Sequence, residues 1–412
     1  MKALHTQVAV IGGGPAGMAA ALAASREGAS VVVLERNAYL GGILNQCIHD
    51  GFGLLRLGKL LSGPEYAGLF AAQVAEDTNI VVMPGAMVTE VTVQKQIYCV
   101  SRDGLSCVEA EAVVFATGCR ERTRGAIAIP GTRPAGVYTA GVVQHLLNLQ
   151  NTAVGRKAVI LGSGDIGLIM ARRLVLSGVE VDCVLEKLPY CSGLSRNKYQ
   201  CLEDYGIPLY LSRTVTKIRG DKRLESVSVG RFDENGNALP GTEYEISCDT
   251  LILSVGLIPE NEIAGKAGVA LHPETNGAMV DSHLETSVSG MFACGNSMQV
   301  NDLVDNVSDE GDVAGKWAAF HALGRAPQAA GTCPVRQGDG LRYITPQLIY
   351  PEEDAALSFR VTAPGQDKTL RVSSGNKTLM EKTLKRVNPA EMIRVHFPAQ
   401  EISQGEITVS LL

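Results

Sequence analysis

The chain has 412 residues, more than one ordinary domain needs, so we expect two or three domains. A hydrophobic fraction of 45% and a charged fraction of 19% are typical of a globular protein with a large core. The net charge of −6 argues against a nucleic-acid partner, because phosphate contacts require a basic surface.

No apolar run is long enough to span a bilayer. Residues 1–7 lack the character of a signal peptide, since an apolar strand begins at Val8. Ten cysteines without paired spacing are typical of reduced thiols. Together these features predict a cytoplasmic protein without a transmembrane segment.

The first predicted element is a strand, turn and helix over residues 7–35. An apolar run leads directly into Gly12, Gly14 and Gly17, which have the spacing of a dinucleotide-binding turn. In such a turn the first glycine permits a tight bend, the second lets the backbone approach a pyrophosphate, and the third lets the helix pack on the strand. A second apolar run ends at Glu35, the position of an acid that accepts hydrogen bonds from ribose hydroxyls.

Less regular elements follow this unit. A glycine-rich loop covers residues 41–53, and a helix is expected over residues 64–77. Alternating polar and apolar residues over 88–100 predict an antiparallel excursion, and the apolar run 112–116 predicts a buried strand. A further helix is expected over residues 140–149.

The nucleotide unit is then repeated. A second apolar run leads into Gly162, Gly164 and Gly167, and the next one ends at Glu186. One glycine pattern alone is weak evidence for a nucleotide site. Two copies with strand, helix and acid in register predict two dinucleotide sites.

After the second unit, residues 290–296 return the chain to the first domain, and a helix is expected over residues 308–323. Past residue 330, short alternating strands with proline and glycine between them predict an all-β module. We therefore predict an α/β protein with two Rossmann-like (three-layer ββα type) nucleotide-binding domains, the second inserted in the first, plus a small C-terminal all-β module. The expected boundaries are 1–150 and 260–330 for the first nucleotide-binding domain, 151–259 for the inserted one, and 331–412 for the module, which we interpret as an interaction domain.

These segments, in this order, resemble the pyridine nucleotide-disulfide oxidoreductase superfamily, whose members bind FAD in the first domain and NAD(P)H in the inserted one. The resemblance implies the following cofactor-binding residues: Gly12, Gly14, Pro15, Ala16, Gly17, Glu35, Arg36, Gly42, Thr117, Gly118, Gly162, Gly164, Asp165, Ile166, Gly167, Glu186, Gly256, Gly295 and Asn296.

Two of these positions refine the cofactor prediction. Members of the superfamily carry an Asp that bonds a ribityl hydroxyl of FAD, and this chain has Asn296 there. An amide can still bond a hydroxyl, so FAD binding is retained although a negative charge is lost. Glu186 would repel a 2′-phosphate, which favours NAD(H) over NADP(H).

The helix after Asn296 normally directs its N-terminus at the flavin, where its dipole stabilises negative charge. Three acids, Asp305, Asp309 and Glu310, lie near the start of this helix. We expect them to face solvent, because buried acids are rare.

Disulfide reductases of this superfamily carry a close pair of cysteines beside the flavin. Here the nearest pairs, Cys99 with Cys107 and Cys183 with Cys191, are eight residues apart, and the loop before His49 holds only Cys47. A dithiol relay is therefore excluded within the first domain.

Cys47 has three interpretations: a single redox thiol that reacts with the flavin, a residue that lines the flavin pocket, or a packed and inert thiol. His49 is a candidate proton donor to an acceptor, or a structural histidine. We assign both as candidate catalytic residues. The scattered histidines and cysteines predict no metal site.

A closer likeness is to a bacterial subfamily of FAD/NAD(P)-dependent oxidoreductases found alongside a glycerol-3-phosphate dehydrogenase-like flavoprotein. It rests on residues 42–49, 61–67, 162–171 and 301–305. It implies a subunit, expected to form an oligomer, that transfers hydride between NAD(H) and FAD and exchanges electrons with an unidentified acceptor or a partner dehydrogenase subunit. The alternatives are a single-cysteine NADH oxidase or peroxidase that uses Cys47, and a non-catalytic assembly subunit with structural nucleotides.

Overall fold

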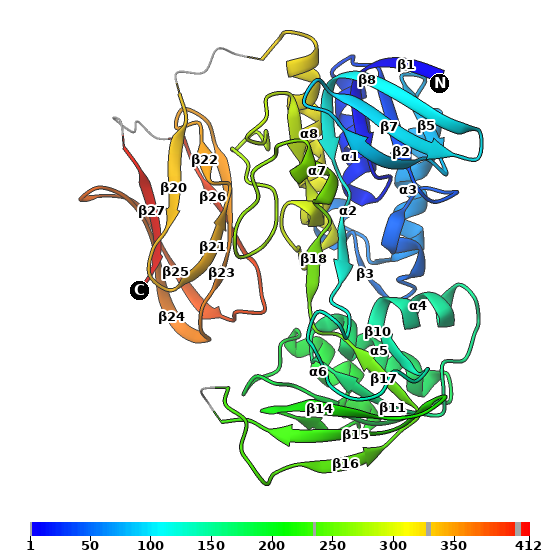
Figure 1. Ribbon diagram of the computed structural model, residues 1–412. Coiled ribbons are helices and arrows are strands. Elements are labelled where there is room, and N and C mark those ends of the chain that lie inside the picture. The colour runs from blue at the N-terminus through cyan, green and yellow to red at the C-terminus, as the bar shows by residue number, and fades with distance from the viewer. Residues whose placement is uncertain (1, 234–235, 327–330, 400–404) are drawn as a thin grey trace. The chain divides into compact units, whose positions relative to one another are not determined.

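The computed structural model describes residues 2–233, 236–326, 331–399 and 405–412 (Figure 1). The chain forms two compact units: unit 1 contains Met1–Cys119 and Pro259–Leu412, and unit 2 contains Arg120–Ile258. The second unit is thus inserted in the first, as the sequence predicts. In the described part of the chain, no helix is long and apolar enough to cross a membrane.

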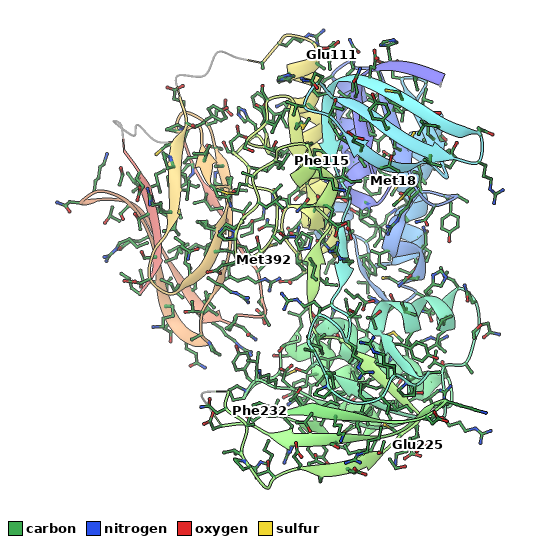
Figure 2. The ribbon with its side chains drawn as sticks, viewed as in Figure 1. Met18, Glu111, Phe115, Glu225, Phe232 and Met392 are labelled. Carbon is green, nitrogen blue, oxygen red and sulfur yellow. The ribbon has the colours of Figure 1, made fainter. Side chains whose placement is uncertain are left out.

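A seven-stranded sheet forms the centre of unit 1, in the order β5-β2-β1-β8-β7-β6, with β19 beside β8. Its strands are β1 (Lys2–Ile11), β2 (Val31–Glu35), β5 (Ile80–Pro84), β6 (Met87–Val91), β7 (Gln96–Ser101), β8 (Gly104–Phe115) and β19 (Met291–Ala293). Strands β6 and β7 form the predicted antiparallel excursion, and the other strands pair in parallel. Val8 and Val10 of β1 are fully buried, as expected of a central parallel strand covered on both faces. Met18 and Phe115, labelled in Figure 2, also belong to this core.

Helices α1 (Pro15–Arg26) and α8 (Val304–Ala322) of unit 1 pack so closely that glycine is required at their contact. A Cβ on Gly311 would lie 2.3 Å from the carbonyl oxygen of Ala16, and one on Gly315 would lie 2.1 Å from that of Ala20. Because backbone atoms are the obstacle, no rotation of a side chain can relieve either clash. Helix α8 begins four residues before the predicted start, since Val304 and Asp305 already pack into the protein.

Short elements follow β2 in the glycine-rich loop and lead into the next helix. They are η1 (Gly42–Gln46), β3 (Asp50–Phe52), α2 (Leu54–Leu57), β4 (Leu61–Ser62) and α3 (Gly63–Glu76). Helix α3 begins with a capping box, in which Ser62 and Glu65 each bond the other's backbone, and with a proline in its first turn. The predicted helix over residues 64–77 is confirmed within one residue at each end.

Unit 2 is built around a five-stranded parallel sheet in the order β10-β17-β11-β12-β13. The strands are β10 (Val137–Thr139), β11 (Lys157–Leu161), β12 (Glu180–Leu185), β13 (Leu209–Tyr210) and β17 (Thr250–Leu253). One hydrophobic cluster joins the sheet to helices α4 (Ala140–Asn148), α5 (Asp165–Leu176) and α6 (Ser195–Cys201). A second cluster joins it to an antiparallel sheet of β14 (Arg213–Gly220), β15 (Leu224–Arg231) and β16 (Tyr244–Ser247). The two clusters give the three layers, ββα, that the sequence predicts.

The start of unit 2 differs from the expected boundary between residues 150 and 151. Strand β10 pairs in parallel with β17, and α4 packs beside α5, so both elements belong to the inserted unit. The chain leaves unit 1 after Cys119 and returns at Pro259. The apolar pattern of residues 140–149 predicted a helix, but it did not indicate which sheet this helix packs against.

The C-terminal residues form the predicted all-β module. One sheet has the order β22-β20-β27-β24-β25 and the other the order β21-β23-β26. The strands are β20 (Cys333–Gln337), β21 (Leu341–Thr345), β22 (Leu348–Ile349), β23 (Ala355–Val361), β24 (Gly365–Ser374), β25 (Lys377–Val387), β26 (Ile393–Phe397) and β27 (Ile407–Leu411). Phe359 and Phe397 are fully buried between the strands.

The module belongs to unit 1 and bonds the return segment of that unit. Arg360 of β23 forms an ion pair with Asp302, and the backbone amide of Met392, labelled in Figure 2, donates to the same carboxylate. The ring of His283 stacks on those of Trp317 and Tyr350 and bonds Glu353 at 2.7 Å. These contacts bury polar groups that removal of the module would expose.

Candidate functional site

The first glycine-rich turn has the geometry that its sequence predicts. Gly12 has φ +106°, and a Cβ there would lie 2.4 Å from the carbonyl oxygen of Ala116. A Cβ on Gly17 would lie 1.8 Å from the carbonyl oxygen of Gly12, so the helix rests directly on the turn. A Cβ on Gly14 would meet no atom within 4 Å, which leaves open space beside the backbone at the start of α1. Pro15 and Ala16 form the first turn of that helix, whose amides can bind an anion.

Glu35, the acid of the first nucleotide unit, has hydrogen-bond acceptor positions left for a ligand. The Glu35 carboxylate is buried and accepts hydrogen bonds from the amides of Gly13 and Asn37, each at 2.7 Å. A carboxylate offers about four acceptor positions, so about two remain for ribose hydroxyls. The neighbouring Arg36 is exposed. Gly42, at φ +55°, starts η1 and lies against the turn, because a Cβ on it would lie 3.1 Å from the Cα of Gly14.

Gly295 and Asn296 lie at the same end of α1. A Cβ on Gly295 would lie 2.8 Å from that of Ala16. The Asn296 Oδ1 accepts a hydrogen bond from the amide of Asn301 at 2.9 Å, and its Nδ2 is 3.6 Å from the Cys119 sulfur. Thr117 and Gly118 directly follow the strand end that Gly12 touches: the Thr117 hydroxyl and the Gly118 carbonyl both bond Glu260. Contacts thus join Glu35, Gly42 and Gly295 to the first turn and the start of α1, while Arg36 faces solvent.

The expectation that the three acids near the start of α8 face solvent was wrong for two of them. Asp305 is 3% exposed and Glu310 is 5% exposed. Asp305 is stabilised by the amide of Arg56 at 3.0 Å, while the half-exposed Asp309 pairs with the Arg56 guanidinium at 2.8 Å. Acids are rarely buried, but hydrogen-bond donors from the backbone and from side chains compensate the unfavourable burial of these two carboxylates.

Glu310 is the residue near this site that sequence reasoning missed. Its carboxylate accepts hydrogen bonds from the amide of Gly295, the side chain of Gln299 and the side chain of Asn301, at 2.8–3.0 Å. Burial raises the pKa of Glu310 to about 7, against the opposing effect of these donors. In the sequence, only its position directly before Gly311 indicates that Glu310 is buried. Gly311 contacts α1, so the neighbouring Glu310 also faces the protein interior.

The first turn has two features that fit FAD. Gly14 leaves open space beside the start of α1, and Glu35 has unused acceptor positions. A pyrophosphate and an adenosine ribose need these two features. Within the described residues, the side-chain oxygens of Asn261, Gln299 and Asn301 are buried and accept no hydrogen bond.

The loop after η1 carries Cys47 and His49. The Cys47 sulfur is 3.4 Å from the carbonyl oxygen of Ile43, and its side chain is half-buried. His49 is half-buried, its Nδ1 lies 2.9 Å from the carbonyl oxygen of Asp50, and its ring lies 5.1 Å from that of Phe52. All ten cysteines are in described residues and none forms a disulfide.

Unit 2 repeats the turn of unit 1. A Cβ on Gly162 would lie 2.0 Å from the carbonyl oxygen of Ser254, and one on Gly167 would lie 2.4 Å from that of Gly162. A Cβ on Gly164 would again meet no atom within 4 Å. Asp165 and Ile166 open helix α5, and Asp165 accepts hydrogen bonds from the amide of Leu194 and the side chain of Asn197. Gly256, at φ +103°, follows the last strand of the sheet.

The acids of the two units differ in their hydrogen bonds. Glu186 is buried and accepts from the amide and hydroxyl of Ser163, the hydroxyl of Ser192 and the amide of Leu188, at 2.6–3.0 Å. These four donors occupy about all the acceptor positions of a carboxylate. A ribose hydroxyl can therefore reach Glu186 only by replacing one of these donors, whereas Glu35 has positions to spare.

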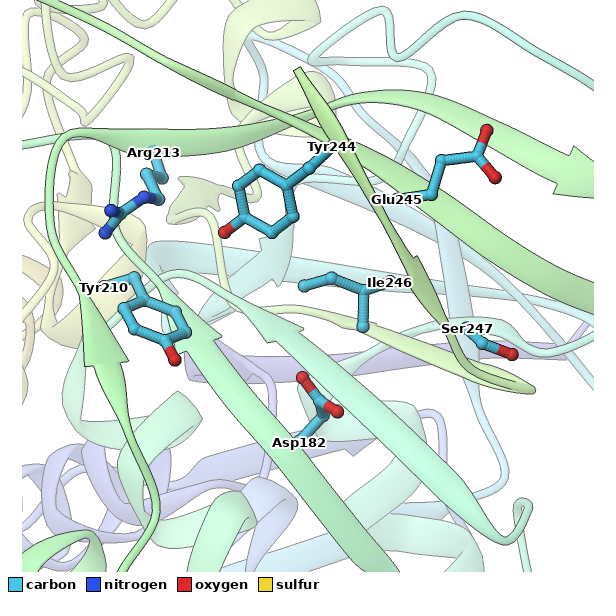
Figure 3. Close-up of a pocket in the computed structure, with 7 residues that line it drawn as sticks. All are labelled: Asp182, Tyr210, Arg213, Tyr244, Glu245, Ile246 and Ser247. Atoms are coloured by element: carbon cyan, nitrogen blue, oxygen red, sulfur yellow. The ribbon is translucent and has the colours of Figure 1, made fainter. Parts of the chain in front are cut away.

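Unit 2 also contains an open cavity of about 440 Å³ (Figure 3). It is lined by Asp182, Tyr210, Arg213, Tyr244, Glu245, Ile246 and Ser247. None of the residues predicted for a cofactor lies in this lining. The guanidinium of Arg213 lies over the ring of Tyr210, while Asp182 and Glu245 pair with Lys157 and Arg219. The residues predicted for the cofactors therefore lie at the glycine-rich turns and not in this cavity.

Comparisons with known proteins agree with this geometry. The pyridine nucleotide-disulphide oxidoreductase family matches residues 6–311. An opine oxidase subunit from Agrobacterium tumefaciens (strain Ach5) is 26% identical over 76% of this chain. The ferredoxin reductase component of chlorobenzene dioxygenase from Cupriavidus sp. (strain PS12) is 29% identical over 71% of this chain and 67% of its own length.

The aligned region covers 64% of the opine oxidase protein, so the chain spans less than two thirds of that relative. Among solved structures, thioredoxin reductase of T. acidophilum has a TM-score of 0.64 at 24% identity, over 78% of this chain and 99% of its own. That likeness confirms the two-domain nucleotide-binding fold.

The family match covers more than half of the chain and includes both glycine-rich turns. The open space beside Gly14 and Gly164 and the buried acids of the two turns fit FAD and a nicotinamide nucleotide. The chain belongs to the pyridine nucleotide-disulphide oxidoreductase family, whose cofactors are FAD and a nicotinamide nucleotide.

Proposed function

We propose that the protein transfers hydride between NAD(H) and FAD and exchanges the electrons with a partner subunit that resembles glycerol-3-phosphate dehydrogenase. The observation that carries this proposal is the combination of two complete glycine-rich turns with a loop at residues 41–53 that holds one cysteine, Cys47. A disulfide reductase would pass the electrons to a cysteine pair. The loop holds no such pair, so we assign the electrons to an acceptor other than a disulfide of this chain.

The names of two relatives support an external partner. One is a subunit of an oxidase, and another is the reductase component of a dioxygenase. Both names describe proteins that work with other chains. We extend this property to the present protein as part of the proposal, together with the assignment of the predicted residues to the two cofactors.

The residues of the site have separate tasks. FAD, when bound, supplies a ring that accepts hydride at N5. The amides at the start of α1 hold the pyrophosphate, and Glu35 holds the adenosine ribose through its unused acceptor positions. The second turn and Glu186 orient the nicotinamide nucleotide. Cys47 and His49 are the candidates for contact with the reacting ring or the acceptor.

The purified protein is expected to contain FAD and to transfer electrons from NADH to an artificial dye. The absorbance spectrum, mass spectrometry of the released cofactor and an NADH–dye assay test this. FMN in place of FAD, or a protein without flavin, would contradict the proposal. Mixing with a glycerol-3-phosphate dehydrogenase-like flavoprotein subunit should link glycerol-3-phosphate oxidation to NAD⁺ reduction. If no such coupling occurs while dye reduction is fast, only the partner assignment fails.

We expect the enzyme to prefer NADH to NADPH, because the charge of Glu186 opposes a 2′-phosphate. Glu186→Gln keeps the size of the side chain and removes the charge. This variant should lower the NADH-to-NADPH ratio of kcat/KM by about tenfold, equivalent to about 1.4 kcal/mol. Asp182→Asn, an acid in the lining of the cavity of unit 2, is the matched control and should leave the ratio unchanged. Equal use of both nucleotides by the unaltered protein would remove the role assigned to Glu186.

A second candidate function, a single-cysteine NADH oxidase or peroxidase, is favoured by one observation: Cys47 is half-buried and shares a loop with His49. In the leading proposal, Cys47→Ser keeps most of the NADH–dye activity, because hydride transfer to flavin needs no thiol. Stopped-flow reduction and peroxide turnover measure the difference. The unaltered protein is mixed with NADH and with peroxide. If it shows long-wavelength charge-transfer absorbance and turns over peroxide, and Cys47→Ser loses both properties, the second candidate is favoured.

A further inference from the structure

The buried carboxylate of Glu310 has no task in the proposed hydride transfer. It lies in the second turn of α8 and reaches back to the segment that follows β19. It accepts the amide hydrogen of Gly295 at 2.9 Å and side-chain hydrogens of Gln299 at 2.8 Å and Asn301 at 3.0 Å. Ionised acids are rarely buried to this degree without a counter-charge in direct contact.

Two opposing effects act on this carboxylate. Its three donors and the positive charge of Arg394, on β26, favour the ionised form, while complete burial favours the protonated form. The other titratable neighbour is the fully buried Cys294 thiol, whose pKa burial raises, so it stays neutral and adds no charge. The result is a pKa of about 7 for Glu310, so both forms are populated near neutrality.

The surroundings can accommodate either form. The ionised carboxylate accepts from the amide groups of Gln299 and Asn301, as the structure shows. The oxygens of the same two amides are buried and accept nothing within the described residues. If one amide turns by about 180°, its oxygen can accept the hydrogen of a protonated Glu310. The cluster is thus complementary to the acid as well as to the carboxylate.

The same cluster is bonded to the residue expected at the flavin. Asn301 donates its side-chain hydrogen to Glu310 and its backbone hydrogen to the Oδ1 of Asn296. Gly295, which also donates to Glu310, is the residue directly before Asn296. Two hydrogen bonds therefore separate the carboxylate from the side chain expected to bond the ribityl chain.

We propose that Glu310 is a positioning residue that couples reduction of the bound flavin to the uptake of one proton from water. NADH gives one hydride, which is two electrons and one proton, and is oxidised to NAD⁺. The transfer makes the bound flavin more negative by one charge. Glu310 then takes a proton from water and becomes neutral, and it releases this proton when the electrons pass to the acceptor. This inference rests on the proposed function, because it requires FAD at the first turn.

The test is an equilibrium titration of the FAD-loaded protein with reference dyes between about pH 5.5 and about pH 8.5. At the acid end Glu310 is protonated in both redox states, so Glu310→Gln and the unaltered protein should have the same ratio of reduced to oxidised flavin. At the alkaline end the variant should hold about tenfold more reduced flavin at the same dye potential, the effect of a shift by about one pKa unit.

The matched control is Asp312→Asn, which removes one negative charge from the same helix at an acid that pairs with Arg26 and Arg56. Its loss should change the ratio by a factor that is constant with pH. A constant factor for Glu310→Gln as well would overturn the proposal.

If Glu310→Gln does not bind FAD, the unaltered protein supplies the decisive measurement. Its infrared difference spectrum at about pH 8, reduced minus oxidised, should gain a band of a protonated carboxylic acid. Absence of this band overturns the proposal even when NADH–dye activity is intact. A protein that binds no flavin contradicts the proposed function instead, so the two failures are distinguishable.

Discussion

Gly311→Ala is expected to destabilise unit 1 by about 3 kcal/mol and to release FAD, although it adds only one methyl group. The new Cβ would lie 2.3 Å from the carbonyl oxygen of Ala16 and 2.9 Å from the Cβ of Ala19. Because the nearest obstacle is the backbone of α1, the two helices must move apart. Ala16 is in the first turn of α1, so the amides that hold the pyrophosphate move with it.

Gly68→Ala is the matched control, because Gly68 is also inside a helix. It is exposed on α3, and a Cβ there would meet no atom within 4 Å. Alanine is a better helix former than glycine, so this variant should be more stable by about 1 kcal/mol. Denaturant unfolding, followed by flavin release, measures both changes. Equal behaviour of the two variants would show that the contact between α1 and α8 is looser than described.

The stability of the flavin-free protein is expected to fall as pH rises towards 7, and Glu310→Gln should remove this fall. The pKa of Glu310 is about 7 in the folded protein and 4.5 as the ordinary value, so folding favours the protonated form. The stability due to this group is present below the ordinary value and is lost as pH rises through about 7. The free energy of unfolding should fall by about 3 kcal/mol in this way.

The measurement compares the unfolding free energy of the variant with that of the unaltered protein at about pH 5 and about pH 8. The variant should gain about 3 kcal/mol relative to the unaltered protein between these values. A difference that does not change with pH would mean that the Glu310 carboxylate is ionised throughout and that its donors outweigh its burial.

The sequence predicted both nucleotide turns because their glycines report local backbone geometry. Gly12 and Gly17 are required by contacts within one strand, turn and helix, and such contacts leave a pattern in consecutive residues. The first domain boundary was not predictable in this way. The helix α4 has an ordinary pattern, and only the pairing of β10 with β17, more than a hundred residues away, places it in unit 2.

The burial of acidic side chains was also not predictable from the sequence. Asp305 and Glu310 were expected in solvent because an acid in a helix usually faces water. Their burial depends on donors outside their own helix: the amide of Arg56, 249 residues from Asp305, and the amide of Gly295, 15 residues from Glu310. The occupied acceptor positions of Glu186 were hidden for the same reason, since Ser163 and Ser192 bond it from two other segments. Residue types indicated the cofactors, but the state of each acid depended on the tertiary structure.

The order of strands in the C-terminal module has a consequence for how the protein is made. The last strand, β27, lies in the middle of its sheet, between β20 and β24. Until residues 407–411 have been synthesised, both neighbours present unpaired edges, and unpaired edges promote aggregation. Its pairing with β20 also joins segments that are far apart in the sequence, which slows folding. Pairing of β27 with β20 and β24 therefore completes this sheet, and residues 407–411 determine whether the earlier strands find their correct partner.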